Sequence, residues 1–194
     1  MANSWDEVAA NWDAENATNE YADKAFESLQ KVVDLKGMHI LDFGCGTGLL
    51  SQRMSPVAKD IVALDSSEAM IEQLDMKELA NVEPVVDILS RGLVAMHPAF
   101  RAQFDLVVAS SVCSFLPSYS DTADIVFSLL DEGSYFVHWD WLSDKDKDEV
   151  GGMTIAHAQQ VLSSVGFSEV VVTTPFDIET PDGTLKVLMA VAKK

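Results

Sequence analysis

Residues 40–48 of this 194-residue chain read ILDFGCGTG and contain the clearest structural signal in the sequence. Its apolar start is typical of a buried strand, which ends at the acid Asp42. Three glycines follow at alternate positions, Gly44, Gly46 and Gly48, and an apolar helical pattern begins directly after them. Glycine allows a sharp turn and lets a ligand approach the backbone closely. The stretch therefore predicts a strand, a glycine turn and a helix, although such a turn by itself is also compatible with no ligand.

The glycine turn differs from the one that binds dinucleotides. The dinucleotide pattern has its third glycine three residues after the second, where this chain has Leu49. An acid beside a helix N-terminus also competes with a diphosphate there, and Asp42 lies beside the turn. An acid at this point suits a ligand with a positively charged end, such as the ammonium group of an amino acid. The turn thus argues against an NAD-dependent oxidoreductase, which is the weakest alternative.

Outward from this stretch, strand-like and helix-like segments alternate to the end of the chain. Continuous apolar runs are typical of buried parallel strands, and their alternation with helices predicts a sheet covered on both faces. We expect an α/β fold in one domain over residues 1–194, with a Rossmann-like, doubly wound, mostly parallel sheet of about seven strands and a C-terminal antiparallel strand pair. The expected strands are residues 39–42, 60–65, 82–87, 104–109, 134–138, 167–174 and 184–192. The other expected segments are helices over 18–35, 49–55, 67–79, 121–130 and 154–165, a helix over 88–103 broken near Pro98, and a polar loop over 140–152.

The chain is strongly acidic, with 13 Lys and Arg against 31 Asp and Glu and a net charge of −18. Phosphate contacts dominate nucleic-acid binding, so a bulk negative field disfavours DNA, RNA and anionic membranes as partners. No apolar stretch is long enough to span a bilayer and no apolar leader follows Met1, which predicts a cytoplasmic protein. Cys45 and Cys113 are then expected as reduced thiols. No metal site is expected, because the cysteines and histidines lie far apart in the sequence.

Several motifs, in the right order, carry a family resemblance. The glycine stretch at 40–48, the acid Asp65 after the second strand, the pair Asp87-Ile88 after the third and residues 104–110 in the fourth resemble the Rossmann-fold (class I) S-adenosylmethionine-dependent methyltransferases of the small-molecule type. The resemblance extends over nearly the whole chain. It implies an enzyme that transfers a methyl group from S-adenosylmethionine to a small molecule and releases S-adenosylhomocysteine.

The resemblance also implies roles for individual residues of a cofactor site. Asp65, with Ser66 beside it, would hold the two ribose hydroxyls, since an ionised carboxylate can accept both protons. The pair Asp87-Ile88 would meet adenine, the carboxylate at the exocyclic amine and the next amide at the ring edge. Met70 would pack on the adenine, with core packing as the alternative. The complete expected set is Asp42, Gly44, Cys45, Gly46, Gly48, Asp65, Ser66, Met70, Asp87, Ile88 and Ala109, joined by Trp12 and Tyr21.

The acceptor side carries weaker signals. Methyl transfer from a sulfonium mainly needs donor and acceptor held in line, and needs a base only where the acceptor must lose a proton early. Many small-molecule members have a histidine after the fourth strand, but residues 112–116 contain none. His138, at the end of the fifth strand, is the catalytic candidate, Asp140 is an equal one, and a structural role is the alternative. The remaining acceptor-side candidates are Ser110, Ser114, Trp139 and Trp141, with packing as the alternative for both tryptophans.

The first part of the chain, residues 1–36, is expected to form a helical lid. Its Trp12 and Tyr21 either contact the cofactor or acceptor or pack the first helices on the sheet. Closure of such a segment would exclude water. The expected partner is a small-molecule acceptor, whose identity the sequence leaves open together with the oligomeric state. A non-catalytic module that binds S-adenosylmethionine is the main alternative to an enzyme.

Overall fold

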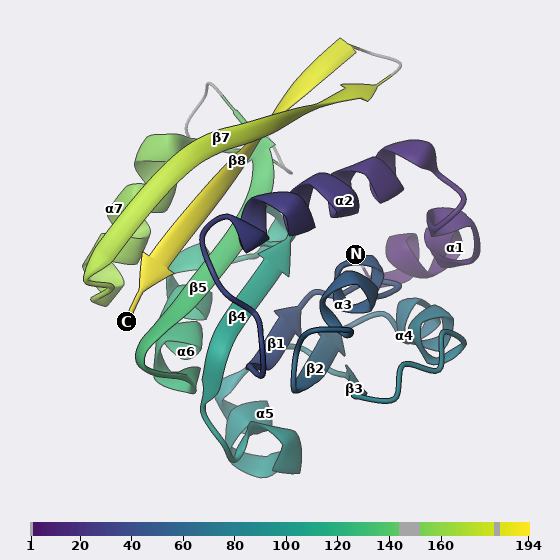
Figure 1. The fold of residues 1–194 in the computed structure, drawn as a ribbon, viewed down its shortest axis with the longest axis horizontal. Helices are drawn as coiled ribbons and strands as arrows, with labels where there is room; N and C mark the ends of the chain where they lie inside the picture. The colour runs from purple at the N-terminus through teal and green to yellow at the C-terminus, as the bar shows by residue number, and fades with distance from the viewer. Residues whose placement is uncertain (1, 144–151, 181–182) are drawn as a thin grey trace. The chain divides into compact units, whose positions relative to one another are not determined.

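The computed structural model describes residues 2–143, 152–180 and 183–194 (Figure 1). The chain divides into two compact units, Met1–Ala102 and Gln103–Lys194. We call them the N-terminal unit and the C-terminal unit and describe each by itself.

The N-terminal unit is a set of three parallel strands with helices between them. The strands lie in the order β3-β2-β1, and the register pairs Phe43 with Leu64 and Asp65 with Val86. The carboxyl ends of all three strands therefore lie at one edge, and this edge carries the glycine turn. The elements are α1 (Ala2–Trp12), α2 (Asn16–Gln30), β1 (His39–Phe43), α3 (Leu49–Met54), β2 (Asp60–Asp65), α4 (Glu68–Asp75), β3 (Val82–Val86), α5 (Arg91–Met96) and η1 (Pro98–Phe100).

The apolar pattern explains why these strands form. β1 and β2 are buried along almost their whole length, as expected for parallel strands covered on both faces. β3 contains Pro84 and is less buried, and it is the last strand in the order of this unit. A last strand tolerates proline because it needs backbone hydrogen bonds on one side only.

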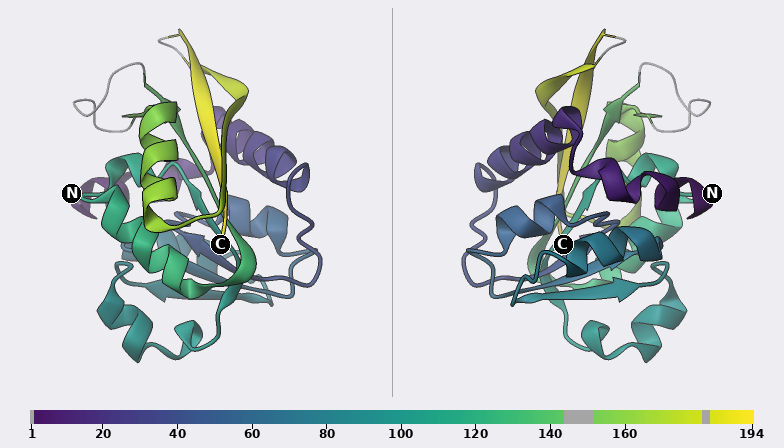
Figure 2. Two further views of the ribbon diagram at one scale, coloured as in Figure 1. Left: turned by 90° about the vertical axis from the view of Figure 1, so that its left-hand side faces the viewer. Right: turned by 90° about the vertical axis from the view of Figure 1, so that its right-hand side faces the viewer.

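The C-terminal unit begins with parallel strands and ends with antiparallel ones. Its strands lie in the order β4-β5-β8-β7, with β6 beside β5; β4 and β6 run parallel to β5, while β8 runs antiparallel to both β5 and β7. Figure 2 shows α6 and α7, which contact each other, along one face of these strands. The elements are β4 (Phe104–Ser110), η2 (Cys113–Phe115), α6 (Tyr119–Leu129), β5 (Leu130–Leu142), β6 (Gly152–Met153), α7 (Ile155–Val165), β7 (Glu169–Thr180) and β8 (Gly183–Lys193).

The expected fold class is confirmed: an α/β fold, mostly parallel, with a C-terminal antiparallel pair. Several expected boundaries are wrong. The helix predicted over 18–35 ends at Gln30, the helix predicted over 67–79 ends at Asp75, and the strand predicted over 134–138 begins at Leu130. The sequence predicts a loop over 140–152, but β5 continues to Leu142 and β6 begins at Gly152; residues 144–151 lie outside the described part. The final hairpin is longer than expected, because β7 passes Pro175 through a register shift between Thr173 and Phe176. That irregularity removes the need for a backbone donor at the proline.

Candidate functional site

The glycine turn connects β1 to α3 and requires glycine for two reasons. Gly44, Gly46 and Gly48 all have positive φ, at 68°, 54° and 78°. A Cβ on Gly48 would also lie 2.3 Å from Cδ1 of Leu74 on α4. The turn is held to the neighbouring strand by the Gly44 amide, which donates to the Leu64 carbonyl over 2.7 Å. The sequence prediction of a tight turn after β1 is thus confirmed.

Asp65, at the end of β2, ties the glycine turn to the start of α4. One carboxylate oxygen accepts a hydrogen bond from the Gly46 amide at 2.8 Å, and the other accepts one from the Ser67 amide at 2.9 Å. Burial raises the pKa of this carboxyl, while the backbone hydrogen bonds oppose that rise. Each oxygen of an ionised carboxylate has a second lone pair. Asp65 therefore keeps acceptor capacity for two further hydroxyl donors.

Asp42, at the end of β1, is almost completely buried, with 1% of its surface exposed. Its Oδ2 accepts the Ser51 hydroxyl at 2.6 Å. Its Oδ1 is buried without a hydrogen-bond partner among the described residues. Burial raises the pKa of Asp42 to about 6, and the neighbouring Asp65 adds to the rise. A buried carboxylate oxygen without a partner is costly, so this position suits a cationic or hydrogen-bond-donating ligand group.

The expected adenine residues follow β2 and β3. Met70 on α4 is buried, and its sulfur lies 3.9 Å from where a Cβ on Gly46 would be. The Asp87 amide donates to the Asp65 carbonyl over 3.0 Å, and Asp87 lines a cavity of about 360 Å³ with Leu93 and Met96. The Ile88 amide donates to the Asp87 carboxylate at 2.7 Å, so that carboxylate must turn before the amide can meet a ligand. Ile88 itself is 69% exposed.

Two further expected cofactor residues have different surroundings. Cys45 packs against the buried cluster of Ala63, Ile71 and Leu74, and burial raises the pKa of its thiol. Ser66 is exposed. The backbone of residue 45 belongs to the turn, and its side chain contributes to packing.

The first helix contacts the loops of this site through acids that sequence analysis missed. Asp13, just after α1, accepts the Thr47 hydroxyl at 2.5 Å and forms an ion pair with Lys77 over 2.7 Å. Asp6 on α1 accepts the Ser67 hydroxyl. Figure 1 shows α1 beside α4 in agreement with the contacts between these helices. No sequence motif indicates these pairings, because each joins residues 34 to 64 positions apart.

The expected aromatic residues of the N-terminal segment lie on both first helices. Trp12 is partly exposed and stacks edge-to-face on Trp5, with ring centroids 5.8 Å apart. Tyr21 on α2 is buried. Contact of Trp12 or Tyr21 with a cofactor stays a prediction.

The C-terminal unit holds the acceptor-side candidates, and its polar centre is fully buried. His138 and Asp140 have no exposed surface, and His138 Nδ1 lies 2.8 Å from Asp140 Oδ2. His138 Nε2 lies 2.7 Å from the Tyr119 hydroxyl, and the Ser114 amide donates to Asp140 Oδ1 at 2.9 Å. Burial raises the pKa of Tyr119, and the charge of Asp140 adds to the rise. Tyr119, which sequence analysis missed, thus belongs to the same cluster as His138.

The other acceptor-side candidates differ in burial. Trp139 has no exposed surface, while Trp141 and Ser110 are partly exposed. Ala109, which is expected to contact the cofactor, has no exposed surface either. Cys113, His138 and Asp140 bring three possible metal-ligand atoms within 4.8 Å of one another. The distance of the cysteines from the histidines along the sequence therefore does not by itself argue against a metal site. Both ring nitrogens of His138 are occupied by hydrogen bonds, and burial raises the pKa of the Cys113 thiol. The absence of a metal stays a prediction.

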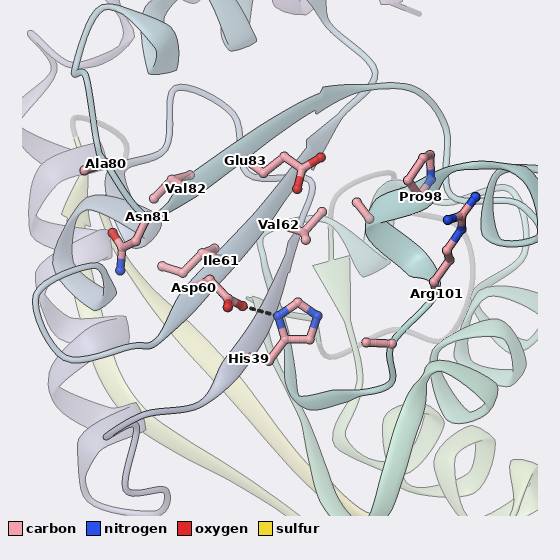
Figure 3. A pocket seen from close by; sticks show the side chains of 12 residues that line it. His39, Asp60, Ile61, Val62, Ala80, Asn81, Val82, Glu83, Pro98 and Arg101 are labelled. Carbon is pink, nitrogen blue, oxygen red and sulfur yellow. Dashed lines mark hydrogen bonds and ion pairs between the residues drawn. The ribbon is translucent and has the colours of Figure 1, made fainter.

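A larger cavity of about 460 Å³ lies at the other end of the N-terminal strands (Figure 3). It includes His39 and Asp60, which begin β1 and β2 and are hydrogen-bonded to each other. It contains none of the expected site residues. Ligands of open α/β sheets bind at the carboxyl ends of strands, so we place the candidate site at the glycine turn instead.

The family model for a methyltransferase domain matches residues 14–169. The chain belongs to this methyltransferase family. The chain is 28% identical over 138 residues to an uncharacterized methyltransferase of Schizosaccharomyces pombe, covering 62% of this chain and 47% of the relative. It is also 28% identical over 101 residues to the ubiquinone biosynthesis O-methyltransferase of Shewanella pealeana, covering 51% of this chain and 42% of that protein. The chain thus spans less than half the length of these two relatives.

Solved structures agree with the fold. A structure described as a complex of DhpI with SAM and HEP superposes with a TM-score of 0.77 at 20% identity, covering 99% of this chain and 95% of that chain. Magnesium protoporphyrin IX methyltransferase from Synechocystis PCC 6803, with bound SAM, gives a TM-score of 0.67 at 20% identity over 90% of this chain and 79% of its own. Within the described ranges, no helix combines the length and the apolar character needed to cross a lipid bilayer.

Proposed function

We propose that this chain transfers a methyl group from S-adenosylmethionine to a small-molecule acceptor. The observation that carries the proposal is the buried Oδ1 of Asp42, which has no hydrogen-bond partner among the described residues and lies beside a glycine turn tied to Asp65. This arrangement fits a ligand that has an ammonium group at one end and ribose hydroxyls next to it. Asp42 would hold the ammonium group, and Asp65 would accept the hydroxyls.

The remaining residues of the N-terminal unit would complete the cofactor site. Met70 and Asp87 lie where the adenine end would follow the ribose, after β2 and β3. Glycine at positions 44, 46 and 48 leaves the turn open to close approach by the ligand. Trp12, next to the Asp13–Thr47 contact, would help to exclude water from the site.

The bound cofactor supplies a methyl group that its sulfonium charge already activates. The protein then needs to hold the acceptor in line and keep water out, and orientation of this kind contributes about 7–11 kcal/mol. Several relatives bear names of quinone-modifying methyltransferases, which supports a small-molecule acceptor. The net charge of −18 also supports a small molecule rather than a nucleic acid as the methyl acceptor. We also propose a cytoplasmic location, in which the free thiols of Cys45 and Cys113 stay reduced.

Calorimetry with the purified chain tests cofactor binding. We expect S-adenosylmethionine and S-adenosylhomocysteine to bind and NAD at equal concentration to give no heat. Equal or tighter binding of NAD would reverse the proposal.

Mass spectrometry then tests methyl transfer on a panel of catechol, protocatechuate, hydroquinone, glutarate and glycine. We expect a cofactor-dependent gain of one methyl group on at least one compound. Binding of S-adenosylhomocysteine without any methylation would favour the non-catalytic module, a reading to which the fully buried His138 gives some support.

A further inference from the structure

The loop between β4 and α6 and the first residue of α6, together residues 111–119, are hydrogen-bonded to three consecutive residues of β5. The Ser111 amide donates to the Trp139 carbonyl at 2.7 Å, and the Ser114 amide donates to the Asp140 carboxylate at 2.9 Å. The Tyr119 hydroxyl is hydrogen-bonded to His138 Nε2 at 2.7 Å. Ser111 also has a positive φ of 59°, an uncommon conformation for a residue other than glycine. A strained backbone persists where surrounding contacts enforce it. The loop is therefore held in one specific conformation.

Hydrogen bonds occupy both nitrogens of the His138 ring. A carboxylate can only accept, so Asp140 Oδ2 receives the Nδ1–H of His138. Nε2 is hydrogen-bonded to the Tyr119 hydroxyl. The ring also packs against Phe136, with centroids 5.2 Å apart. His138 therefore has no lone pair left for a proton of the acceptor.

The loop carries one polar atom that the described part of the protein does not satisfy. The Ser114 hydroxyl is buried and has no hydrogen-bond partner among the described residues, although its own amide is bound to Asp140. A buried hydroxyl without a partner is unfavourable, and a site that leaves one open is often completed by a ligand. Ser114 follows the end of β4, and ligands of α/β sheets bind at this end of the strands.

We propose that Tyr119, His138 and Asp140 are positioning residues, which fix the loop after β4 so that the Ser114 hydroxyl binds an oxygen or nitrogen of the methyl acceptor. The proposal rests on the proposed function. It makes His138 a residue that positions the loop rather than a general base. It predicts an acceptor with a hydrogen-bonding group close to the methylated atom. Proton transfer is not part of the role of this cluster.

Amide hydrogen exchange of the whole chain tests the positioning role without any acceptor. Tyr119→Phe removes only the hydroxyl that bonds to His138, and Tyr135→Phe, on β5, is the matched control. We expect amides of residues 111–119 to exchange at least fivefold faster in Tyr119→Phe and to be unchanged in the control. Equal exchange in wild type and Tyr119→Phe would overturn the positioning role. Calorimetry with S-adenosylhomocysteine, expected to be unchanged in both variants, separates this result from failure of the proposed function.

Kinetics with the compound that the wild type methylates in the panel test the role of Ser114. Ser114→Ala is compared with Ser128→Ala, which removes an exposed hydroxyl bonded to its own helix. We expect Ser114→Ala and Tyr119→Phe to raise the KM for the acceptor at least fivefold, with the KM for S-adenosylmethionine and kcat within a factor of three. Loss of kcat by a factor of 100 or more in Tyr119→Phe would instead indicate proton transfer. An unchanged acceptor KM in Ser114→Ala, or a panel without any methylated compound, overturns the role of Ser114.

Zinc binding tests the alternative that Cys113, His138 and Asp140 form a metal site. We expect equilibrium dialysis with Zn²⁺ to show no difference between wild type and Cys113→Ser. A bound zinc ion that this substitution removes would overturn the proposal, because the ion would take the atoms of His138 and Asp140 that now hold the loop.

Discussion

Asp65 shows how much one side chain does at this site. Its two oxygens hold the amides of Gly46 and Ser67, and they are proposed to accept the two ribose hydroxyls as well. Removing it would therefore affect both the turn and the ligand.

We expect Asp65→Ala to weaken binding of S-adenosylhomocysteine at least tenfold, because each hydrogen bond to a charged group contributes about 1.5–3 kcal/mol. Calorimetry measures the change. Asp75→Ala, an exposed acid at the end of α4, is the control and should bind as the wild type does. An affinity unchanged by Asp65→Ala would place the ribose elsewhere.

Asp42 links stability to pH. Because its pKa is raised from 3.8 to about 6 in the folded protein, the folded state binds a proton more tightly than the unfolded state. The resulting stabilisation is fully present below about pH 4 and is lost as the pH rises through about 6. The ionised form then lowers the free energy of unfolding by about 3 kcal/mol near neutral pH, an order-of-magnitude value.

We therefore expect Asp42→Asn to unfold at higher urea concentration than the wild type, with an advantage that grows by about 1 kcal/mol between pH 5 and pH 8. Urea denaturation of the ligand-free chain at these two pH values measures it. Asp75→Asn should show no such trend. A constant difference between Asp42→Asn and wild type would mean that Asp42 is not the titrating group.

At the scale of elements, the turn between β1 and α3 depends on its contact with α4. Gly48 and Gly37 have similar positive φ values, 78° and 74°, but only Gly48 has a neighbour in the way of a Cβ. The two glycines thus separate the backbone effect from the packing effect.

We expect Gly37→Ala to destabilise the chain by about 1 kcal/mol, the cost of the left-handed conformation, and Gly48→Ala by about 2–4 kcal/mol, because Leu74 must also move. Chemical denaturation of the two variants measures the difference. An equal loss of unfolding free energy in the two variants would show that Leu74 moves aside at no energetic cost.

The sequence was sufficient to predict those elements whose signals are local. The apolar run of β1, its acid and the glycine turn are all within nine residues, and the structure has them in place. The predicted fifth strand ends too early, because the polar and acidic composition of residues 140–152 is typical of a loop. In the structure Asp140 is buried and satisfied by His138 and Ser114, partners whose positions only the fold determines. The contacts of Asp6 and Asp13 with Ser67 and Thr47 could not be predicted for the same reason.

At the scale of the whole molecule, the net charge of −18 acts on every ligand that approaches. S-adenosylmethionine carries one more positive charge than S-adenosylhomocysteine, so the field of the protein attracts it more strongly. Salt screens this attraction, with a Debye length of about 10 Å at 0.1 M.

We expect the affinity for S-adenosylmethionine to fall more than that for S-adenosylhomocysteine, by a factor of about two to five, when NaCl rises from 50 to 500 mM. Parallel calorimetric titrations at both concentrations check this. Potassium acetate in place of NaCl is the control for a specific chloride effect. If the affinities for the two ligands fall by the same factor, the long-range field of the protein does not discriminate between them, and only local contacts do.

The raised pKa of Asp42 also connects occupancy to the acidity of the surroundings. A carboxyl that is partly protonated near pH 6 must give up its hydrogen ion before it can hold an ammonium group. Binding of the cofactor at the proposed site would then release part of a proton to the buffer, and, by reciprocity, the affinity for the cofactor would fall as the pH drops through about 6.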